Sequence, residues 1–245
     1  MSNAQPSLRS PKSPPREAER RFFFWTASAI LLLVFIGFSR TYFLHKLFGR
    51  PEVSRFLSIH GAVMSGWILL FFVQTALISA RRVNMHRILG YFGAGYAAIV
   101  VLFGCTATVL SARREVRGHT TAVFGFLNVL ALELTQMLLF ATLVSLAVCW
   151  RNRLDYHKRL MLLATLCILP NVFVRLFISV VDSNLGFLAI WTVPVVGLVL
   201  LDSIRNRKLH PAFSYGAPIV LAVMYAAYFV GNTEAWRNFA ARSVG

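Results

Sequence analysis

Residues 59–94 read IHGAVMSGWILLFFVQTALISARRVNMHRILGYFGA, two apolar runs separated by the basic turn ARRVN. A helix needs about 20 mostly apolar residues to cross a bilayer. The first run has this length, and the second continues apolar to Ala112. Arginines between such runs are typical of a short loop at a membrane surface. This stretch therefore predicts a helical hairpin that crosses a membrane twice.

The composition of the whole chain supports the same interpretation. Of its 245 residues, 57% are hydrophobic and 14% are charged, whereas a soluble domain averages about 25% charged residues. The mean hydropathy is +0.64. The net charge of +16 would suggest nucleic-acid binding in a soluble protein, but here Lys and Arg fall between apolar blocks and can anchor loops at anionic headgroups. Composition therefore predicts a multi-pass membrane protein whose partner is the lipid bilayer, with no nucleic acid.

Seven segments are long and apolar enough to cross a membrane. They are Phe22–Ser39, Arg55–Ala80, His86–Ala112, Thr120–Trp150, Tyr156–Val181, Leu185–Leu201 and Pro211–Val230. Because the connections are short, consecutive helices should be antiparallel neighbours. The predicted fold class is an all-α membrane protein, a bundle of about seven transmembrane helices with a four-helix core made by helices 2–5. This transmembrane domain covers 22–231, between a disordered basic cytoplasmic tail, 1–21, and a short C-terminal tail, 232–245.

The basic residues set the predicted orientation. The tail and the segments 81–87, 151–159 and 203–210 hold 15 of the 25 Lys and Arg residues, and all four fall on one side of the predicted bundle. Cytoplasmic segments carry such an excess, so the N-terminus is predicted to be cytoplasmic.

Four histidines occur at the N-terminal ends of four consecutive predicted helices. They are His60, His86, His119 and His157. Because neighbouring helices run in opposite directions, His60 should meet His119 on the outer side. For the same reason His86 should meet His157 on the inner side. Each pair would offer two imidazoles from facing helices.

Two facing imidazoles are what a b-type haem requires, because its iron takes one neutral imidazole on each face of the porphyrin. Helices 2 and 4 would hold one haem and helices 3 and 5 a second, so that electrons could cross the bilayer. A simpler interpretation stays open, because histidine is common at membrane interfaces and both His86 and His157 lie beside basic residues. His45 and His210 are predicted to be surface residues.

The glycines and the aromatic residues are weaker evidence for a ligand site. Small residues near the histidines would make room for a planar ligand, or would let helices pack closely; they are Gly61, Gly90, Gly93, Gly95, Gly118 and Gly125. Other aromatic residues fall mostly near the predicted span ends, as in an interfacial belt; they are Trp25, Tyr42, Trp67, Trp150 and Trp191.

Three polar residues fall inside predicted helices: Gln74, Glu133 and Arg175. A charge inside a bilayer costs at least ~2.5 kcal/mol, so it normally has a partner or a role. Gln74 and Glu133 each follow a histidine by 14 residues, so they should share a depth toward the inner half. Arg175 should lie near the outer surface, too far away to pair directly. Glu133 would be protonated and bond Gln74, Asn128 or Gln136, either in a proton or quinone site or as plain interhelical hydrogen bonding.

Three stretches carry a resemblance to known families: FSRTYFL at 38–44, the stretch at 59–94, and DYHKRLMLLATL at 155–166. They resemble an uncharacterised family of bacterial multi-pass inner-membrane proteins, which implies the bacterial inner membrane as location and implies no established activity. More loosely, four histidines on successive helices at alternating ends resemble the two-haem transmembrane cytochromes b of the ascorbate-reducible type. That resemblance implies that His60, His86, His119 and His157 are axial haem ligands.

The leading functional hypothesis is therefore a membrane-embedded electron-transfer protein with two b-type haems, served by a quinone or a redox partner protein. The alternative is a haem-free accessory or assembly subunit, or a small transporter. Transporters often carry helices interrupted by Gly or Pro at mid-depth. The stretches around Pro170 and Pro194 are candidates for such interruptions.

Overall fold

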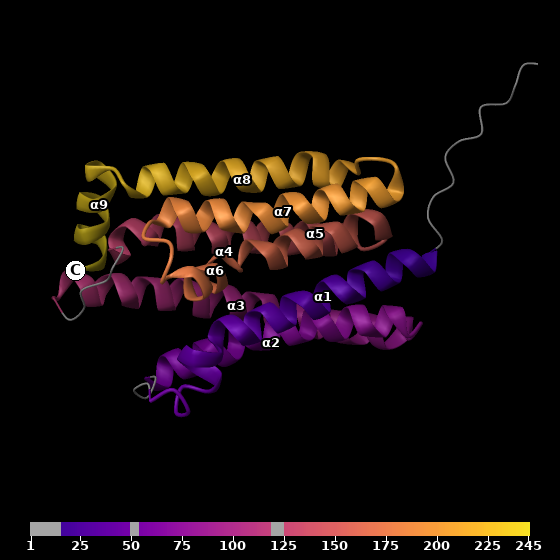
Figure 1. The fold of residues 1–245 in the computed structure, drawn as a ribbon, viewed down its shortest axis with the longest axis horizontal. Coiled ribbons are helices and arrows are strands. Elements are labelled where there is room, and N and C mark those ends of the chain that lie inside the picture. The colour runs from indigo at the N-terminus through magenta and orange to yellow at the C-terminus, as the bar shows by residue number, and fades with distance from the viewer. Residues whose placement is uncertain (1–15, 50–53, 119–124) are drawn as a thin grey trace, which may run out of the picture.

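The computed structural model describes residues 16–49, 54–118 and 125–245, and all regular structure in these ranges is helical (Figure 1). The elements in order are α1 (Arg16–Phe38), the π-helix η1 (Ser39–Phe43), α2 (Arg55–Ser79), α3 (Val83–Val116), α4 (Phe126–Cys149), α5 (Leu154–Cys167), α6 (Pro170–Phe177), α7 (Asn184–Asn206), α8 (Pro211–Gly231) and α9 (Glu234–Val244). The predicted all-α bundle is confirmed. Six of the described helices are long and apolar enough to cross a membrane, or seven if α5 and α6 form one bent span.

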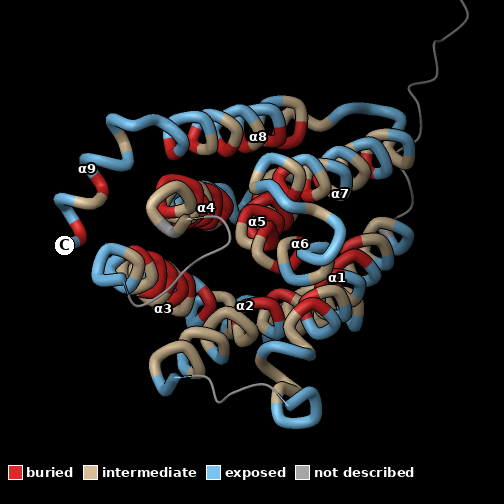
Figure 2. The backbone as a smooth tube through the Cα atoms, turned by 60° about the vertical axis from the view of Figure 1, so that its left-hand side comes forward, coloured by how far each residue is buried: buried red, intermediate tan, exposed pale blue. Residues whose placement is uncertain are grey.

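The outer faces of the bundle are apolar. Figure 2 shows the buried residues turned toward the middle and the exposed residues turned outward. Many exposed side chains are large hydrophobics, including Leu32, Phe35, Phe92, Leu102, Leu138, Val193 and Phe229. Such a continuous apolar surface would be a liability in water, whereas it suits contact with lipid chains.

The long helices run roughly parallel to one another, so the bundle has two ends (Figure 1). One end carries the start of α1 and the connections α2–α3, α4–α5 and α7–α8, with arginines at 81, 82, 151, 153 and 207; we call it the basic end. The other, which we call the far end, carries η1, α9 and the connection from α6 to α7.

Local sequence explains where several helices begin. The hydroxyls of Ser54, Ser183 and Thr233 accept backbone N–H groups at the starts of α2, α7 and α9, which is the usual work of an N-cap residue. Pro170 and Pro211 occupy the first positions of α6 and α8, where a missing N–H has no cost.

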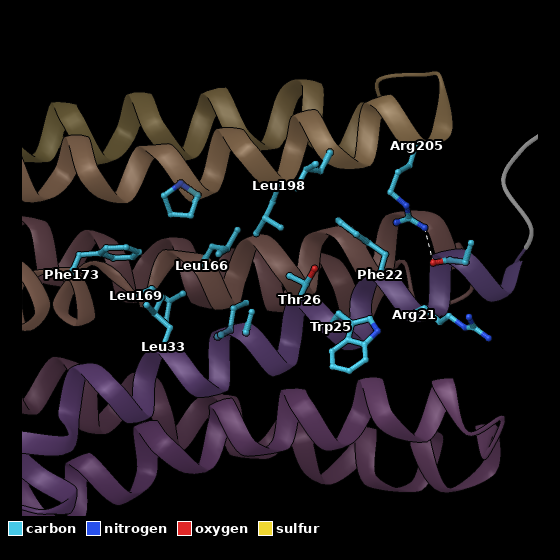
Figure 3. A pocket seen from close by; sticks show the side chains of 15 residues that line it. Arg21, Phe22, Trp25, Thr26, Leu33, Leu166, Leu169, Phe173, Leu198 and Arg205 are labelled. Carbon is cyan, nitrogen blue, oxygen red and sulfur yellow. Dashed lines mark hydrogen bonds between the residues drawn. The ribbon is translucent and has the colours of Figure 1, made fainter.

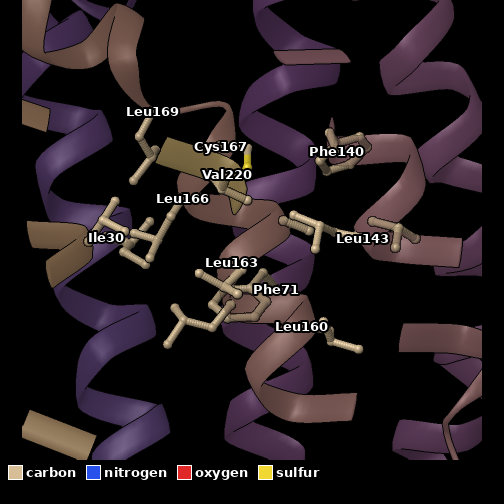
Figure 4. Close-up of a cluster of buried hydrophobic side chains, with 14 of the residues drawn as sticks. Ile30, Phe71, Phe140, Leu143, Leu160, Leu163, Leu166, Cys167, Leu169 and Val220 are labelled. Atoms are coloured by element: carbon tan, nitrogen blue, oxygen red, sulfur yellow. The ribbon is translucent and has the colours of Figure 1, made fainter. Parts of the chain in front are cut away.

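Helix α5 lies at the centre of the bundle, between α4, α7 and α8 (Figure 2). Its residues from Leu162 to Cys167 are all buried, and Figure 4 shows Leu163 and Leu166 among side chains from several helices. Trp67 on α2 connects helices of the predicted core. Its ring lies 4.8 Å from that of Phe140 on α4. The Trp67 indole N–H donates to Thr165 Oγ1 on α5 at 3.3 Å.

A proline breaks the span made by α5 and α6, which meet at a bend of 43°. Pro170 has no N–H to donate to the carbonyl of Leu166, four residues earlier. That carbonyl instead accepts from the Leu169 N–H at 3.1 Å and from the Trp191 indole at 2.8 Å. Trp67 and Trp191 are therefore core residues, and their predicted place in an interfacial belt is wrong. Pro194, the other predicted interruption, lies inside a continuous α7.

The two chain ends differ from the prediction. Helix α1 begins at Arg16, so the last six residues of the predicted disordered tail are helical, and 1–15 lie outside the described residues. The predicted C-terminal tail contains α9, which packs across α3 and α4. Trp236 donates its indole N–H to Leu127 O at 3.0 Å, and Arg113 Nε donates to Val244 O at 3.1 Å. These contacts and a small hydrophobic core under α9 fix this helix against α3 and α4.

A buried ion pair ties α5 to α7 near the basic end. Arg159 and Asp202 are 2% and 0% exposed, and the guanidinium donates twice to the carboxylate, from Nε at 2.8 Å and from Nη2 at 3.0 Å. Such bidentate pairing is the strongest geometry for these groups. Glu19 on α1 extends the network, with Oε1 2.5 Å from Lys158 Nζ. This pair was not predicted from the sequence, because Asp202 falls one residue outside the predicted span.

We expect Asp202→Ala to lower the free energy of unfolding by about 3–5 kcal/mol, because it leaves the Arg159 guanidinium buried without its main partner. Unfolding in mixed detergent micelles, followed by circular dichroism, measures the change. Asp155→Ala is the matched control: its side chain is 66% exposed and contacts the same arginine at 3.8 Å, so its loss should cost under about 1 kcal/mol. Equal effects of the two variants would contradict the assignment.

Candidate functional site

The structure brings His86 and His157 together at the basic end. His86 lies in the first turn of α3 and His157 in the first turn of α5, and their ring centroids are 6.2 Å apart with the rings at 83°. Two imidazoles bound through Nε2 to one metal place their ring centres about 6 Å apart, because each metal–nitrogen bond is about 2 Å. The predicted meeting of these two side chains is therefore found, at a separation that suits a shared metal.

The tautomer of His157 is fixed by the backbone. Its Nδ1 lies 2.8 Å from the carbonyl oxygen of Ala147. A carbonyl oxygen can only accept, so Nδ1 carries the ring proton and Nε2 keeps its lone pair. This is the usual arrangement of a metal-binding histidine, in which the second nitrogen is held by a backbone carbonyl.

Gln74 holds the other ring. Its side-chain amide lies against the first turn of α3, and in the orientation that satisfies both of its ends it donates to His86 Nδ1 at 2.5 Å and to His86 O at 3.2 Å, while it accepts from Gly90 N at 3.0 Å. In that orientation His86 carries its proton on Nε2. Rotation of the amide by a half-turn presents Oε1 to an Nδ1–H and frees Nε2 to bind a metal. That rotation would also turn Oε1 toward His86 O and Nε2 toward the Gly90 N–H, so the orientation that satisfies all of these neighbours holds the His86 proton on Nε2.

Of the second predicted pair, His60 and His119, only His60 lies within the described residues. His60 lies in α2, partly buried, with Nδ1 3.3 Å from the carbonyl oxygen of Phe103 on α3. This contact also places the ring proton on Nδ1 and leaves Nε2 free. The predicted partner, His119, lies outside the described residues. The predicted second site therefore stays a prediction.

Three of the six glycines predicted to make room for a ligand have other roles. A Cβ on Gly61 would lie 2.6 Å from the Tyr42 ring, so this glycine admits a tyrosine whose hydroxyl donates to Ser58 O at 2.7 Å. Gly118 and Gly125 have positive φ angles of 71° and 65°, just after α3 and just before α4, a conformation that glycine adopts most easily. Beside His86, a Cβ on Gly90 would meet only Gln74 Nε2, at 3.8 Å.

A separate polar cluster lies toward the far end. Thr108 Oγ1 on α3 lies 2.7 Å from Glu133 Oε2 on α4, and Asn171 Nδ2 on α6 makes a long contact of 3.5 Å to Glu133 Oε1. Arg175 donates from Nη1 to the carbonyl oxygen of Asn171 at 3.1 Å. Its guanidinium carbon lies 4.3 Å above the ring of Phe38.

The predicted depth of Glu133 is wrong. Gln74 contacts His86, whereas Glu133 contacts Thr108, which lies 22 residues further along α3, or about 33 Å at 1.5 Å per residue. The reason is that α4 begins only at Phe126, so Glu133 is two turns from the far end. Its predicted partners Gln74, Asn128 and Gln136 are replaced by Thr108 and Asn171. The sequence signal that could have found Asn171 is a polar residue directly after a proline in an apolar run.

The two hydrogen-bond contacts of the Thr108 hydroxyl indicate that the Glu133 carboxyl is protonated. The hydroxyl of Thr108 has one hydrogen, and two oxygens lie within its reach, Gly104 O at 3.0 Å and Glu133 Oε2 at 2.7 Å. A protonated carboxyl satisfies both contacts, because it donates to Thr108 Oγ1 while the hydroxyl donates to Gly104 O.

We therefore expect Glu133→Gln to change the free energy of unfolding by less than about 0.5 kcal/mol, because the amide also donates to Thr108 and accepts from Asn171. Glu133→Leu should cost about 1–3 kcal/mol, because it leaves the Asn171 amide without its acceptor. Unfolding in mixed micelles compares the two variants. If the glutamine variant is as unstable as the leucine variant, the side chain is not held as a neutral acid.

His210, predicted to be a surface residue, is partly buried and caps α8. Its Nδ1 accepts the Ala212 N–H at 3.1 Å, and its ring lies 4.7 Å from that of Tyr156. Burial lowers the pKa of His210 below its usual value, the positive charges of Arg159 and Lys158 lower it further, and Asp155 and Asp202 oppose the shift. The folded protein therefore takes up this proton at a lower pH than the unfolded chain does.

The free energy of unfolding should consequently be insensitive to His210 above about pH 6.5 and should fall as the pH drops below it. Protonation also removes the Nδ1 acceptor of the cap, which is worth about 1 kcal/mol. His210→Asn keeps a capping side chain but does not titrate, so its free energy of unfolding should fall less between pH 7 and pH 5. Identical slopes for the wild-type and asparagine proteins would rule out this role.

Comparison of the chain with protein-family models, with curated proteins and with solved structures finds no match. The resemblances noted from the sequence therefore stay predictions, and the geometry of the described residues is the basis for the proposals below.

Proposed function

We propose that the protein is a membrane-embedded b-type haem protein that transfers electrons, with His86 and His157 as the axial ligands of one haem. The observation that carries the proposal is the meeting of these two imidazoles, 6.2 Å apart, from two helices far apart in sequence. The fixed tautomer of His157, with the lone pair on Nε2, supports it.

The number of protein ligands favours a haem over a free metal ion. Within 16–49, 54–118 and 125–245, no three His, Cys, Asp or Glu side chains come together. A zinc site normally needs three or four protein ligands, whereas haem brings four ring nitrogens and needs only two axial ligands. The basic end also offers Arg87, next to His86, as a counter-charge for haem propionates.

In this proposal the chain's own residues have three roles. His86 and His157 bind the iron. The carbonyl of Ala147 orients the His157 ring and holds its proton on Nδ1. Gln74, with its amide rotated by a half-turn, would accept the Nδ1–H of His86 when a metal is bound. A bound haem supplies one-electron chemistry, and a quinone or a partner protein would serve as electron donor or acceptor. By analogy His60, with His119, would hold a second haem at the other side of a bacterial inner membrane.

The test is the absorption spectrum of the protein purified from cells supplied with haem. We expect a Soret band and sharp α-bands in the reduced-minus-oxidised spectrum. His86→Ala and His157→Ala should abolish the bands of one haem. Gln74→Leu, which removes only the partner of Nδ1, should weaken haem retention by about 10–100-fold. His60→Ala should remove the second haem and halve the haem content.

His45→Ala is the matched control, because His45 lies near the far end and its Nδ1 contacts the nearby carbonyl oxygen of Tyr42 at 2.9 Å. It should leave the spectrum unchanged. A folded, colourless protein would contradict the proposal, as would haem that survives both His86→Ala and His157→Ala.

One observation favours a second candidate, a small transporter. The break between α5 and α6 places Asn171 beside Glu133 inside the bundle. Discontinuous helices next to an intramembrane carboxyl group are typical of transporter binding sites. A colourless but fully folded preparation would favour this candidate.

A further inference from the structure

An apolar cleft of about 700 Å³ opens along the side of the bundle between α1 and α7, with α5 and α6 behind it (Figure 3). Aliphatic and aromatic side chains line almost all of it, including Phe22, Leu166 and Phe173. The cleft faces the lipid side of the helices, so its natural occupant comes from the bilayer.

The cleft has a positively charged mouth. Arg205, in the last turn of α7, and Arg21 on α1 both line this end (Figure 3). Arg205 donates from Nη2 to Ala18 O at 2.6 Å, and its guanidinium carbon lies 4.4 Å over the Phe22 ring. Its Nη1 is buried and has no hydrogen-bond partner among the described residues. An unpaired buried donor on a charged group is costly, so this nitrogen has a hydrogen bond to offer to an acceptor beyond the described residues.

The carboxylates near the mouth of the cleft do not neutralise the positive charge of Arg205. Glu19 contacts Lys158 and Arg159, and Glu17 contacts Arg21 at 2.6 Å on the exposed surface. No carboxylate of the described residues pairs with Arg205. An anion therefore complements the mouth better than a neutral group does.

The length of the cleft matches one leaflet. Its lining on α1 extends from Ala18 to Leu33, 15 residues apart, or about 22 Å at 1.5 Å per residue. Half of the hydrocarbon core of a bilayer is about 15 Å thick. A headgroup at the arginines would therefore leave room for an acyl chain that reaches the middle of the membrane.

We propose that this cleft binds one anionic phospholipid, with its phosphate at Arg205 and Arg21 and an acyl chain along the apolar wall toward Phe173. A phosphate oxygen would accept the free Nη1–H of Arg205 in a charge-assisted hydrogen bond. The mouth lies at the basic end, where the excess of arginines suits the anionic leaflet. The proposal does not depend on haem binding, because neither His86 nor His157 lines the cleft.

The test is native mass spectrometry of the protein in detergent, titrated with phosphatidylglycerol or with phosphatidylcholine of the same acyl chains. We expect one phosphatidylglycerol to be retained in preference to phosphatidylcholine. Arg205→Ala should lower the retention of phosphatidylglycerol by about tenfold or more, as expected for the loss of charge-assisted hydrogen bonds. Lys208→Ala, in the adjacent connection and outside the cleft, is the matched control and should retain the lipid.

A second variant separates lipid binding from a failure to fold. Leu198→Trp places an indole in the cleft and leaves both arginines in place, so it should also lower the retention of phosphatidylglycerol. Circular dichroism and size-exclusion chromatography report whether each variant is folded. Equal retention of the two lipids would overturn the proposal, as would retention unchanged in both Arg205→Ala and Leu198→Trp. A prenyl quinone that co-purifies in a one-to-one ratio and is lost in Arg205→Ala would overturn it in favour of a quinone site.

Discussion

Polar groups inside a bilayer have no water to bind, so each one must find a partner within the protein or in a ligand. This constraint explains the main polar contacts of the bundle. The buried guanidinium of Arg159 is held by Asp202, the carbonyl freed by Pro170 accepts the Trp191 indole, and the Glu133 carboxyl meets Thr108. These contacts join helices that are distant in the chain, and they fix how α5, α6 and α7 lie against their neighbours.

The same constraint identifies where ligands could bind. Nη1 of Arg205 is a buried donor without a hydrogen-bond partner among the described residues, and the rings of His86 and His157 meet near the basic end. The first feature underlies the proposed anion site, and the second underlies the proposed haem site. The two features share no residue, so each proposal can be tested independently of the other.

Close packing supplies the remaining specificity. Lipid chains are as apolar as leucine, so helices in a membrane associate through dispersion contacts and close approach more than through the hydrophobic effect. α8 approaches α5 and α4 at Gly216 and Gly231, where a Cβ would meet Leu163 and the backbone of Asn128. At the centre, Trp67 links α2 to both α4 and α5.

The sequence by itself determined the all-α class, the approximate spans and the meeting of His86 with His157, because hydropathy and alternating helix direction are local properties of the chain. It did not determine the offset of one helix relative to another along the bundle axis. The position of Glu133, the core places of Trp67 and Trp191, and the Arg159–Asp202 pair all depend on that offset. Only the tertiary structure decided it, because side chains from non-adjacent helices must interlock before the depth of any one residue is fixed.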